Sequence, residues 1–156
     1  MAKSGMNKSV EFEKYFQELG NSEHKIFDSM KDVFITAATL GFKYGNPIPF
    51  AKSAGEAISL RFFNDDDKKI MDLIALSATD DISILLNDED FLDKKYKLIE
   101  EYANGGMKIM VDNFCKPVVD INELYKFVES FENNSSNSPK TSIDELLRRA
   151  MSSIND

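Results

Sequence analysis

Apolar residues recur at helical spacing along most of the chain, and this pattern predicts a mainly all-α fold. A first short helix is expected within 10–19, with Gly20 at its end, and a second over 30–40, with Gly41 and Gly45 closing it. The later periodic segments predict short helices at 70–76, 82–86, 91–102, 107–114 and 121–131. Together they describe a compact multi-helix domain.

The segment near 46–63 interrupts the helical pattern. Asn46-Pro47-Ile48-Pro49 predicts an extended connection, because residues before proline avoid the helical region. Residues 57–63 fit either a short strand or a short helix. The run 64–67, Asn-Asp-Asp-Asp, precedes an apolar stripe and is expected to cap the helix that follows. It lacks the alternating acidic pattern, the glycine and the twelfth-position Glu of a calcium loop, so no metal is expected there.

A pair of adjacent glycines, Gly105 and Gly106, stands inside a strongly helical pattern. The apolar stripes on both sides suggest two helices, and Asn104 and Gly105 are residues that tolerate the left-handed conformation. We therefore predict a tight helix-to-helix corner, with Gly105 in that conformation. Tyr102, Asn104, Gly105 and Gly106 form this candidate structural motif, and Lys95 falls at the same helical spacing as its apolar neighbours.

The C-terminal region divides into a polar run and an amphipathic helix. We expect a helical domain over 1–132, a flexible Ser/Asn-rich linker over 133–141 and a tethered helix over 142–156, which opens with the capping box Ser142-x-x-Glu145. An isolated helix of this length is marginal in water, so it either folds back onto its own domain or docks on a partner. Its candidate partner-binding residues are Ile143, Leu146, Leu147, Ala150 and Ile154.

Charge is distributed unevenly along the chain. The net charge is −8, but residues 1–61 hold eight Lys/Arg and seven Asp/Glu, so 62–156 carry 11 Lys/Arg against 20 Asp/Glu, a net −9. The second half should repel nucleic acid and suit a basic protein partner. In the first half, aromatic and basic residues alternate as they do on single-strand-binding surfaces, but core aromatics edged by solvated lysines are the stronger explanation of the pattern. The candidate nucleic-acid-binding residues are Lys43, Tyr44, Lys52 and Arg61.

The residues needed for familiar catalytic or metal chemistry are scarce. The chain has one His, His24, in a polar segment and one Cys, Cys115, at an apolar helix end, so neither a nucleophilic triad nor a four-ligand zinc site is expected. Gly105-Gly106 is not followed by the Lys-Ser/Thr of a phosphate-binding loop. We expect no enzyme activity, no cofactor and no metal. The single Cys, the polar N-terminus and the lack of a long apolar run predict a cytoplasmic protein that does not enter a membrane.

Three further stretches occur in order over about 27–114. They are Phe27-Asp-Ser-Met-Lys-Asp-Val-Phe34 continuing through Ala38-Thr-Leu-Gly-Phe42 to Gly45; Ile58-Ser-Leu-Arg-Phe-Phe-Asn64 followed by Ile70-Met-Asp-Leu-Ile-Ala-Leu76; and Ile99-Glu-Glu-Tyr-Ala-Asn-Gly-Gly-Met107. Together these stretches resemble the small accessory "protein 4" family of DNA phosphorothioation, or Dnd, loci of bacteria. The resemblance implies a role in DNA-modification or defence loci and supplies no catalytic residues. The linker and last helix lie outside the stretches that carry it.

Three functions are compatible with these features. The first is a non-enzymatic accessory or scaffold subunit of a prokaryotic modification or anti-phage and anti-plasmid system, which binds a larger ATPase, nuclease or modification component through its acidic half and the last helix. The second is a small DNA-binding module that uses the near-neutral first half and contacts DNA weakly. The third is an enzyme with a divergent site. Self-association into a homo-oligomer is compatible with the first two.

Overall fold

The structure is a computed structural model and describes residues 3–115 and 119–135. The described residues are mainly helical, which confirms the expected all-α class. The chain falls into two compact units, Met1–Val119 and Asp120–Asp156. In the first unit the elements are β1 (Gly5–Met6), η1 (Val10–Phe12), α1 (Glu13–Gly20), α2 (Met30–Lys43), β2 (Ile58–Ser59), η2 (Leu60–Phe62), α3 (Asp65–Thr79), η3 (Ile82–Leu85) and α4 (Glu89–Phe114).

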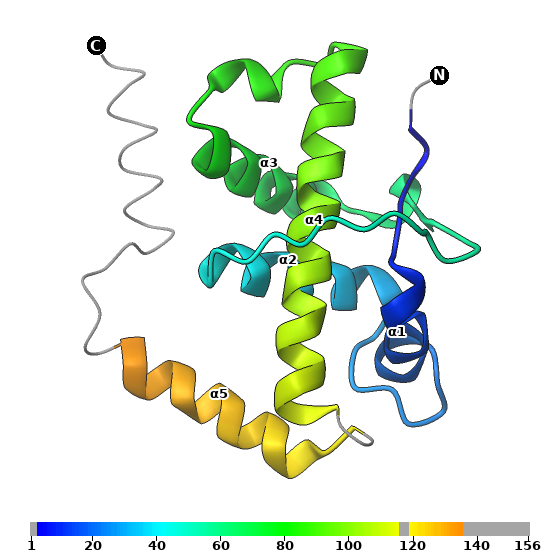
Figure 1. Cartoon of the computed structure of the whole chain (residues 1–156), viewed down its shortest axis with the longest axis vertical. Coiled ribbons are helices and arrows are strands. Elements are labelled where there is room, and N and C mark those ends of the chain that lie inside the picture. Colours follow the sequence, from blue (N-terminus) through cyan, green and yellow to red (C-terminus); the bar gives the residue numbers. More distant parts are fainter. Residues whose placement is uncertain (1–2, 116–118, 136–156) are drawn as a thin grey trace. The chain divides into compact units, whose positions relative to one another are not determined.

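The first unit is built around α4: α2 and α3 pack against α4, and α1 packs against α2 (Figure 1). Its core is made of apolar side chains from all four helices and from the segments between them. The largest side chains that are fully buried are Phe34, Met6, Leu19, Met71, Ile99, Met107, Met110, Val33 and Cys115. In α4 the buried apolar residues recur every three or four positions, so one face of the helix packs into the core; they include Ile99, Ala103, Met107, Met110 and Phe114.

Local capping explains where several helices begin. Asn64 accepts from the Asp67 backbone N–H at 2.8 Å, and the Asp67 carboxylate accepts from the Asn64 N–H at 2.9 Å. This reciprocal capping box confirms the capping role expected for the acidic run. Ser29 precedes α2 but makes no hydrogen bond to a free backbone N–H there, because its hydroxyl lies 2.9 Å from the Asp32 carboxylate instead.

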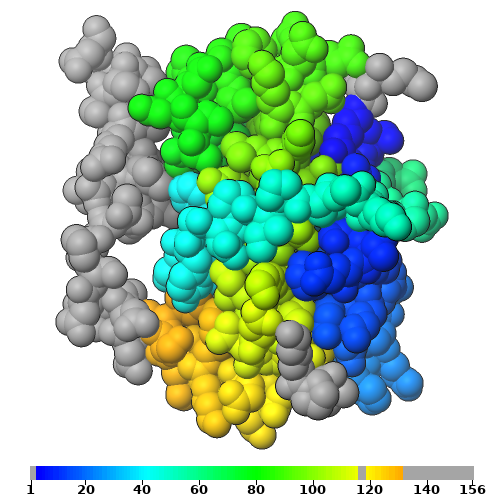
Figure 2. All heavy atoms as spheres, in the orientation of Figure 1, coloured from blue at the N-terminus to red at the C-terminus, as the bar shows by residue number. Residues whose placement is uncertain are grey.

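An extended strap, residues 46–57, connects α2 to β2. Figure 1 and the space-filling view in Figure 2 show it crossing the outer face of α4. The strap ends at a two-residue antiparallel pairing in which Gly5 faces Ser59 and Met6 faces Ile58. The segment 57–63, left open between strand and helix, therefore contains a short strand followed by the 3-10 turn η2.

The second unit contains α5 (Ile121–Ser135). Asp120 accepts from the backbone N–H groups of Asn122 and Glu123, at 2.9 and 3.4 Å, and so begins the helix. The helix extends to Ser135, past Glu132, where the sequence places the end of the domain. The remainder of the expected linker and the helix expected over 142–156 lie outside the described residues.

Candidate functional site

The helix-to-helix corner predicted at Gly105-Gly106 is wrong. α4 is continuous from Glu89 to Phe114, and the two segments expected as separate helices are parts of it. Gly105 has no positive φ; among the described glycines only Gly45 does, with a φ of 59° just after α2. Gly41, expected to help close the second helix, lies inside it. The glycines of α4 therefore have a packing role.

That role is a very close crossing in which α4 lies against α2 and against Asn46 at the start of the strap. A Cβ on Gly106 would overlap the Ala37 carbonyl oxygen, a Cβ on Gly105 would overlap that of Asn46, and a Cβ on Gly41 would overlap that of Tyr102. Backbone thus touches backbone at three points, which no residue with a side chain allows. The loss of helix propensity at two glycines, about 1 kcal/mol each, is offset by the packing that this crossing permits.

Asn104 fastens the strap to the same crossing. Its Nδ2 donates to the Ile48 carbonyl at 2.9 Å, and the Ile48 N–H donates to the Glu101 carbonyl at 2.9 Å. Tyr102 packs edge-on against Phe42, with ring centroids 5.7 Å apart, and burial raises the pKa of its hydroxyl. The four residues of the candidate motif are therefore adjacent in α4, where they join the helix to α2 and the strap.

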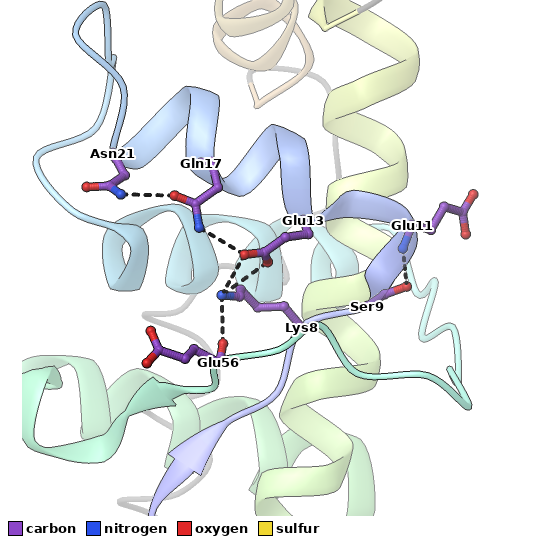
Figure 3. A network of polar contacts seen from close by, with 7 residues as sticks. All are labelled: Lys8, Ser9, Glu11, Glu13, Gln17, Asn21 and Glu56. Carbon is purple, nitrogen blue, oxygen red and sulfur yellow. Dashed lines mark hydrogen bonds and ion pairs between the residues drawn. The ribbon is translucent and has the colours of Figure 1, made fainter.

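A polar cluster near the N-terminus is built around a buried lysine (Figure 3). The Lys8 ammonium donates to the Glu56 carbonyl at 2.9 Å and lies 3.1 Å from Glu13 Oε2. Gln17 donates to Glu13 Oε1 at 2.9 Å, and Asn21 donates to Gln17 at 2.9 Å. Each member of the cluster binds another member or the backbone, so the cluster joins α1 to the strap. Lys8 is buried within it.

The other buried charged side chains are paired in the same manner. Glu100 accepts from the Asn7 N–H at 2.7 Å and contacts the Lys3 ammonium. Lys95 donates to Asp72 at 2.8 Å, so it joins α4 to α3. Asp67 accepts from Lys31 at 2.6 Å as well as from Asn64, and this hydrogen bond is the main cause of the raised pKa of Lys31. These contacts give each charge a structural partner.

The burial of Lys95 could be anticipated from the sequence, because its helical spacing places it on the same face as apolar residues. Lys8 has no comparable signal, because it precedes the first helix and is buried by the strap, which pairs with residues 8–10 and whose Glu56 carbonyl accepts from its ammonium.

The single Cys and the single His of the chain lie in different segments. Cys115 follows α4 and is fully buried, and burial raises the pKa of its thiol to about 12. His24 is exposed in the turn between α1 and α2. Within residues 3–115 and 119–135 there is no group of three His, Cys, Asp or Glu placed to hold a metal ion.

The four candidate nucleic-acid-binding residues are all exposed, but they come from three separate segments. Lys43 and Tyr44 lie at the C-terminal end of α2, Lys52 lies in the strap, and Arg61 lies in η2. The strap that follows α2 crosses α4 before it reaches β2 (Figure 1). Arg61 stacks over Phe62, with its guanidinium carbon 5.1 Å from the ring centroid, and Phe62 is itself 57% exposed.

A further surface feature, which the sequence analysis missed, lies where α3 turns into α4. Ile82 is 71% exposed and Leu86 is 53% exposed, while Ile84 between them is buried. We call residues 80–93 the acidic corner, since they hold six Asp or Glu and no Lys or Arg. The candidate residues of the C-terminal helix, from Ile143 to Ile154, lie outside the described residues.

None of the helices in the described part of the chain is both long and apolar enough to cross a membrane.

Comparison with known proteins places the chain in a family. The family model for DNA sulphur modification system-associated protein 4 matches residues 7–146. This match is wider than the stretches that carry the resemblance, because it also includes the polar run 133–141 and the following residues as far as 146. No match was found among curated proteins or solved structures. The chain belongs to the DNA sulphur modification system-associated protein 4 family.

Proposed function

We propose that this protein is a non-enzymatic accessory subunit of a prokaryotic DNA sulphur modification system that acts in the cytoplasm. It binds a larger ATPase, nuclease or modification component, and the assembly serves defence against phage or plasmid DNA. Family membership supports the link to the system.

The observation that carries the non-enzymatic part of the proposal is the use of the buried charges. Lys8, Asp67, Lys95 and Glu100 are the charged side chains buried within the described residues, and each binds groups of the protein itself. Catalytic acids and bases are instead held open toward a substrate, with a pKa suited to proton transfer. The buried thiol of Cys115, with its raised pKa, is likewise unsuited to nucleophilic attack.

The proposal is tested by reconstitution. The purified protein is mixed with each purified product of its locus, after nuclease treatment, and the mixture is separated by size exclusion. We expect it to co-elute with a larger subunit at fixed stoichiometry. Elution apart from every subunit, or turnover of DNA or nucleotide by the protein alone, would contradict the proposal.

A second candidate function is weak DNA binding by the first half of the chain. The stacking of Arg61 on the exposed Phe62 favours it, because single-strand-binding surfaces combine cations with exposed aromatic rings. The net charge of −9 on residues 62–156 opposes it.

A further inference from the structure

The exposed apolar side chains of the acidic corner, Ile82 and Leu86, belong to a turn whose backbone is fixed by local hydrogen bonds. α3 ends at Thr79, and Asp80 turns the chain with a left-handed φ of 52°. Asp81 then accepts from the Ser83 N–H at 3.0 Å and from the Ser83 hydroxyl at 2.7 Å, which fixes the start of η3. Ile84 packs inward, and η3 contacts both α3 and α4. These hydrogen bonds and contacts fix the conformation of the turn, on which Ile82 and Leu86 are exposed to solvent.

This arrangement differs from the other exposed apolar residues of the first unit. Val10, Ile26, Tyr44 and Phe62 are each single and lie in different segments, as is usual on a protein surface. Ile82 begins η3 and Leu86 directly follows it, so the two side chains stand four positions apart on the connection between α3 and α4. This connection lies at the top of the first unit in Figure 1. Exposed apolar side chains rimmed by charge are a common feature of protein-binding surfaces.

The charged side chains near Ile82 and Leu86 in the sequence are mainly acidic. Asp81 and Asp88 cap η3 and α4, and Asp80, Asp90 and Asp93 are exposed beside them. Along the described part of the sequence, the first cation after this segment is Lys94, whose ammonium lies 5.4 Å from the Phe91 ring centroid. Nucleic acid and anionic lipid surfaces would be repelled here, whereas a basic protein surface would be attracted.

We propose that the acidic corner is the docking surface for the larger subunit, and that the segment it receives carries Lys or Arg around an apolar side chain. The inference rests on the proposed function and names the partner chemistry of that contact. Ile82 and Leu86 supply the apolar centre, and the carboxylates pair with the cations and steer the approach.

A second copy of the chain fits this surface less well. A two-fold contact would bring two acidic corners face to face, and like charges would oppose it. A head-to-tail contact, in which the acidic corner of one copy binds Arg61 and Phe62 of the next, would bring opposite charges together. It would leave one binding surface unoccupied at each end, so copies would add to one another as an open filament. We therefore infer that the occupant of the acidic corner is a different protein.

The test measures binding of each purified larger subunit of the locus to the immobilised full-length protein by interferometry. Leu86→Ser removes apolar surface from the corner, and Val10→Ser is the matched control, because Val10 is also 53% exposed but lies in η1. We expect Leu86→Ser to weaken affinity about tenfold, as for a central interface residue, and Val10→Ser to leave it within about twofold.

A second pair of variants tests the charges. Asp90→Asn with Asp93→Asn should slow association and flatten its dependence on salt, whereas Glu18→Gln with Glu23→Gln removes the same charge from another region and should change neither. All four positions are exposed, and thermal melts should match those of the wild type.

The outcomes separate the two proposals. If the wild type binds a subunit and the corner variants bind it equally well, the docking surface is refuted and the accessory function stands. If the wild type binds no subunit, both are refuted. Concentration-dependent self-association that Leu86→Ser abolishes would identify a second copy as the occupant and overturn the choice of partner.

Discussion

Glycine has two different physical roles in this chain. At Gly45 the backbone needs a left-handed conformation, and nothing lies within 4 Å of the position that a Cβ would take. At Gly105 and Gly106 the backbone is helical, and the space for a Cβ is already filled by the carbonyl groups of Asn46 and Ala37. The first role concerns conformation and the second concerns volume.

These roles predict different costs for substitution by alanine. Helix propensity alone would make Gly105→Ala and Gly106→Ala stabilising by about 1 kcal/mol. Because the added methyl group would force two backbones apart, we expect each to lower the free energy of unfolding by about 3 kcal/mol. Gly45→Ala should cost about 1 kcal/mol from backbone strain. Denaturant titrations of the purified variants measure all three values.

Gly55→Ala is the control, since no atom lies within 4 Å of its Cβ position and its φ is not positive. It should shift the free energy of unfolding by less than about 1 kcal/mol. A stabilised Gly105→Ala variant would show that the close crossing does not exist.

The Cys115 thiol should be unreactive in the folded protein. Its pKa of about 12 leaves almost no thiolate at pH 8, and the side chain is fully buried. Ellman's reagent should therefore react slowly with the native protein and quickly in denaturant. Rapid reaction without denaturant would contradict the burial of this residue.

The same shift has a definite sign for stability. The unfolded thiol, with a pKa of about 8.5, loses its proton before the folded one. Its contribution to stability is therefore intact below about pH 8.5 and decreases as the pH rises toward 12.

At the scale of elements, buried polar contacts join segments that are distant in sequence. Lys8 joins the N-terminal segment to Glu13 and to the backbone of Glu56, and Asn104 joins α4 to the strap. The strap has almost no secondary structure of its own, so its position depends on such contacts. They determine where the strap crosses α4.

Lys8→Met tests this dependence, because the substitution keeps the side-chain stem and removes the ammonium group. Glu13 then loses its cation and the Glu56 carbonyl loses its donor, so we expect a loss of about 1–2 kcal/mol. Backbone amides in 46–57 should also exchange hydrogen faster. Lys69→Met is the control, because the Lys69 side chain is 75% exposed and lies 3.8 Å from Asp66. Equal free energies of unfolding for Lys8→Met and Lys69→Met would show that the Lys8 cluster does not hold the strap in place.

The sequence predicted elements better than it predicted their contacts. Periodicity located the helices, and the capping box of Asn64 and Asp67 was visible in the residue order. The glycine pair was misread as a corner because a glycine in a helix looks unfavourable until a second backbone is known to pass beside it. Ile82 and Leu86 were assigned to a helix, and their exposure depends on how η3 packs against α3 and α4.

At the scale of the whole molecule, charge limits what the protein can bind. Residues 62–156 carry a net −9, and the candidate cations of the first half come from three segments. Both features favour a protein partner over DNA. The C-terminal stripe from Ile143 to Ile154 remains a predicted partner-binding element.

DNA binding by the isolated protein should be weak and sensitive to salt. If Lys43, Lys52 and Arg61 neutralise three phosphates of a single strand, affinity should fall about 20-fold between 50 and 200 mM salt. Fluorescence anisotropy with a labelled single strand measures this slope, and Lys52→Gln with Arg61→Gln should flatten it. Tight binding that is insensitive to salt would show that the charge distribution has been misinterpreted.

The most direct test of the accessory role is purification of the tagged protein from cells that carry its native locus, with nuclease present throughout. Protein identification by mass spectrometry then shows what remains bound. We predict that one larger subunit of the sulphur modification system is recovered in fixed ratio to the tagged protein. Recovery of the protein by itself, or of partners that disappear when DNA is digested, would contradict the account.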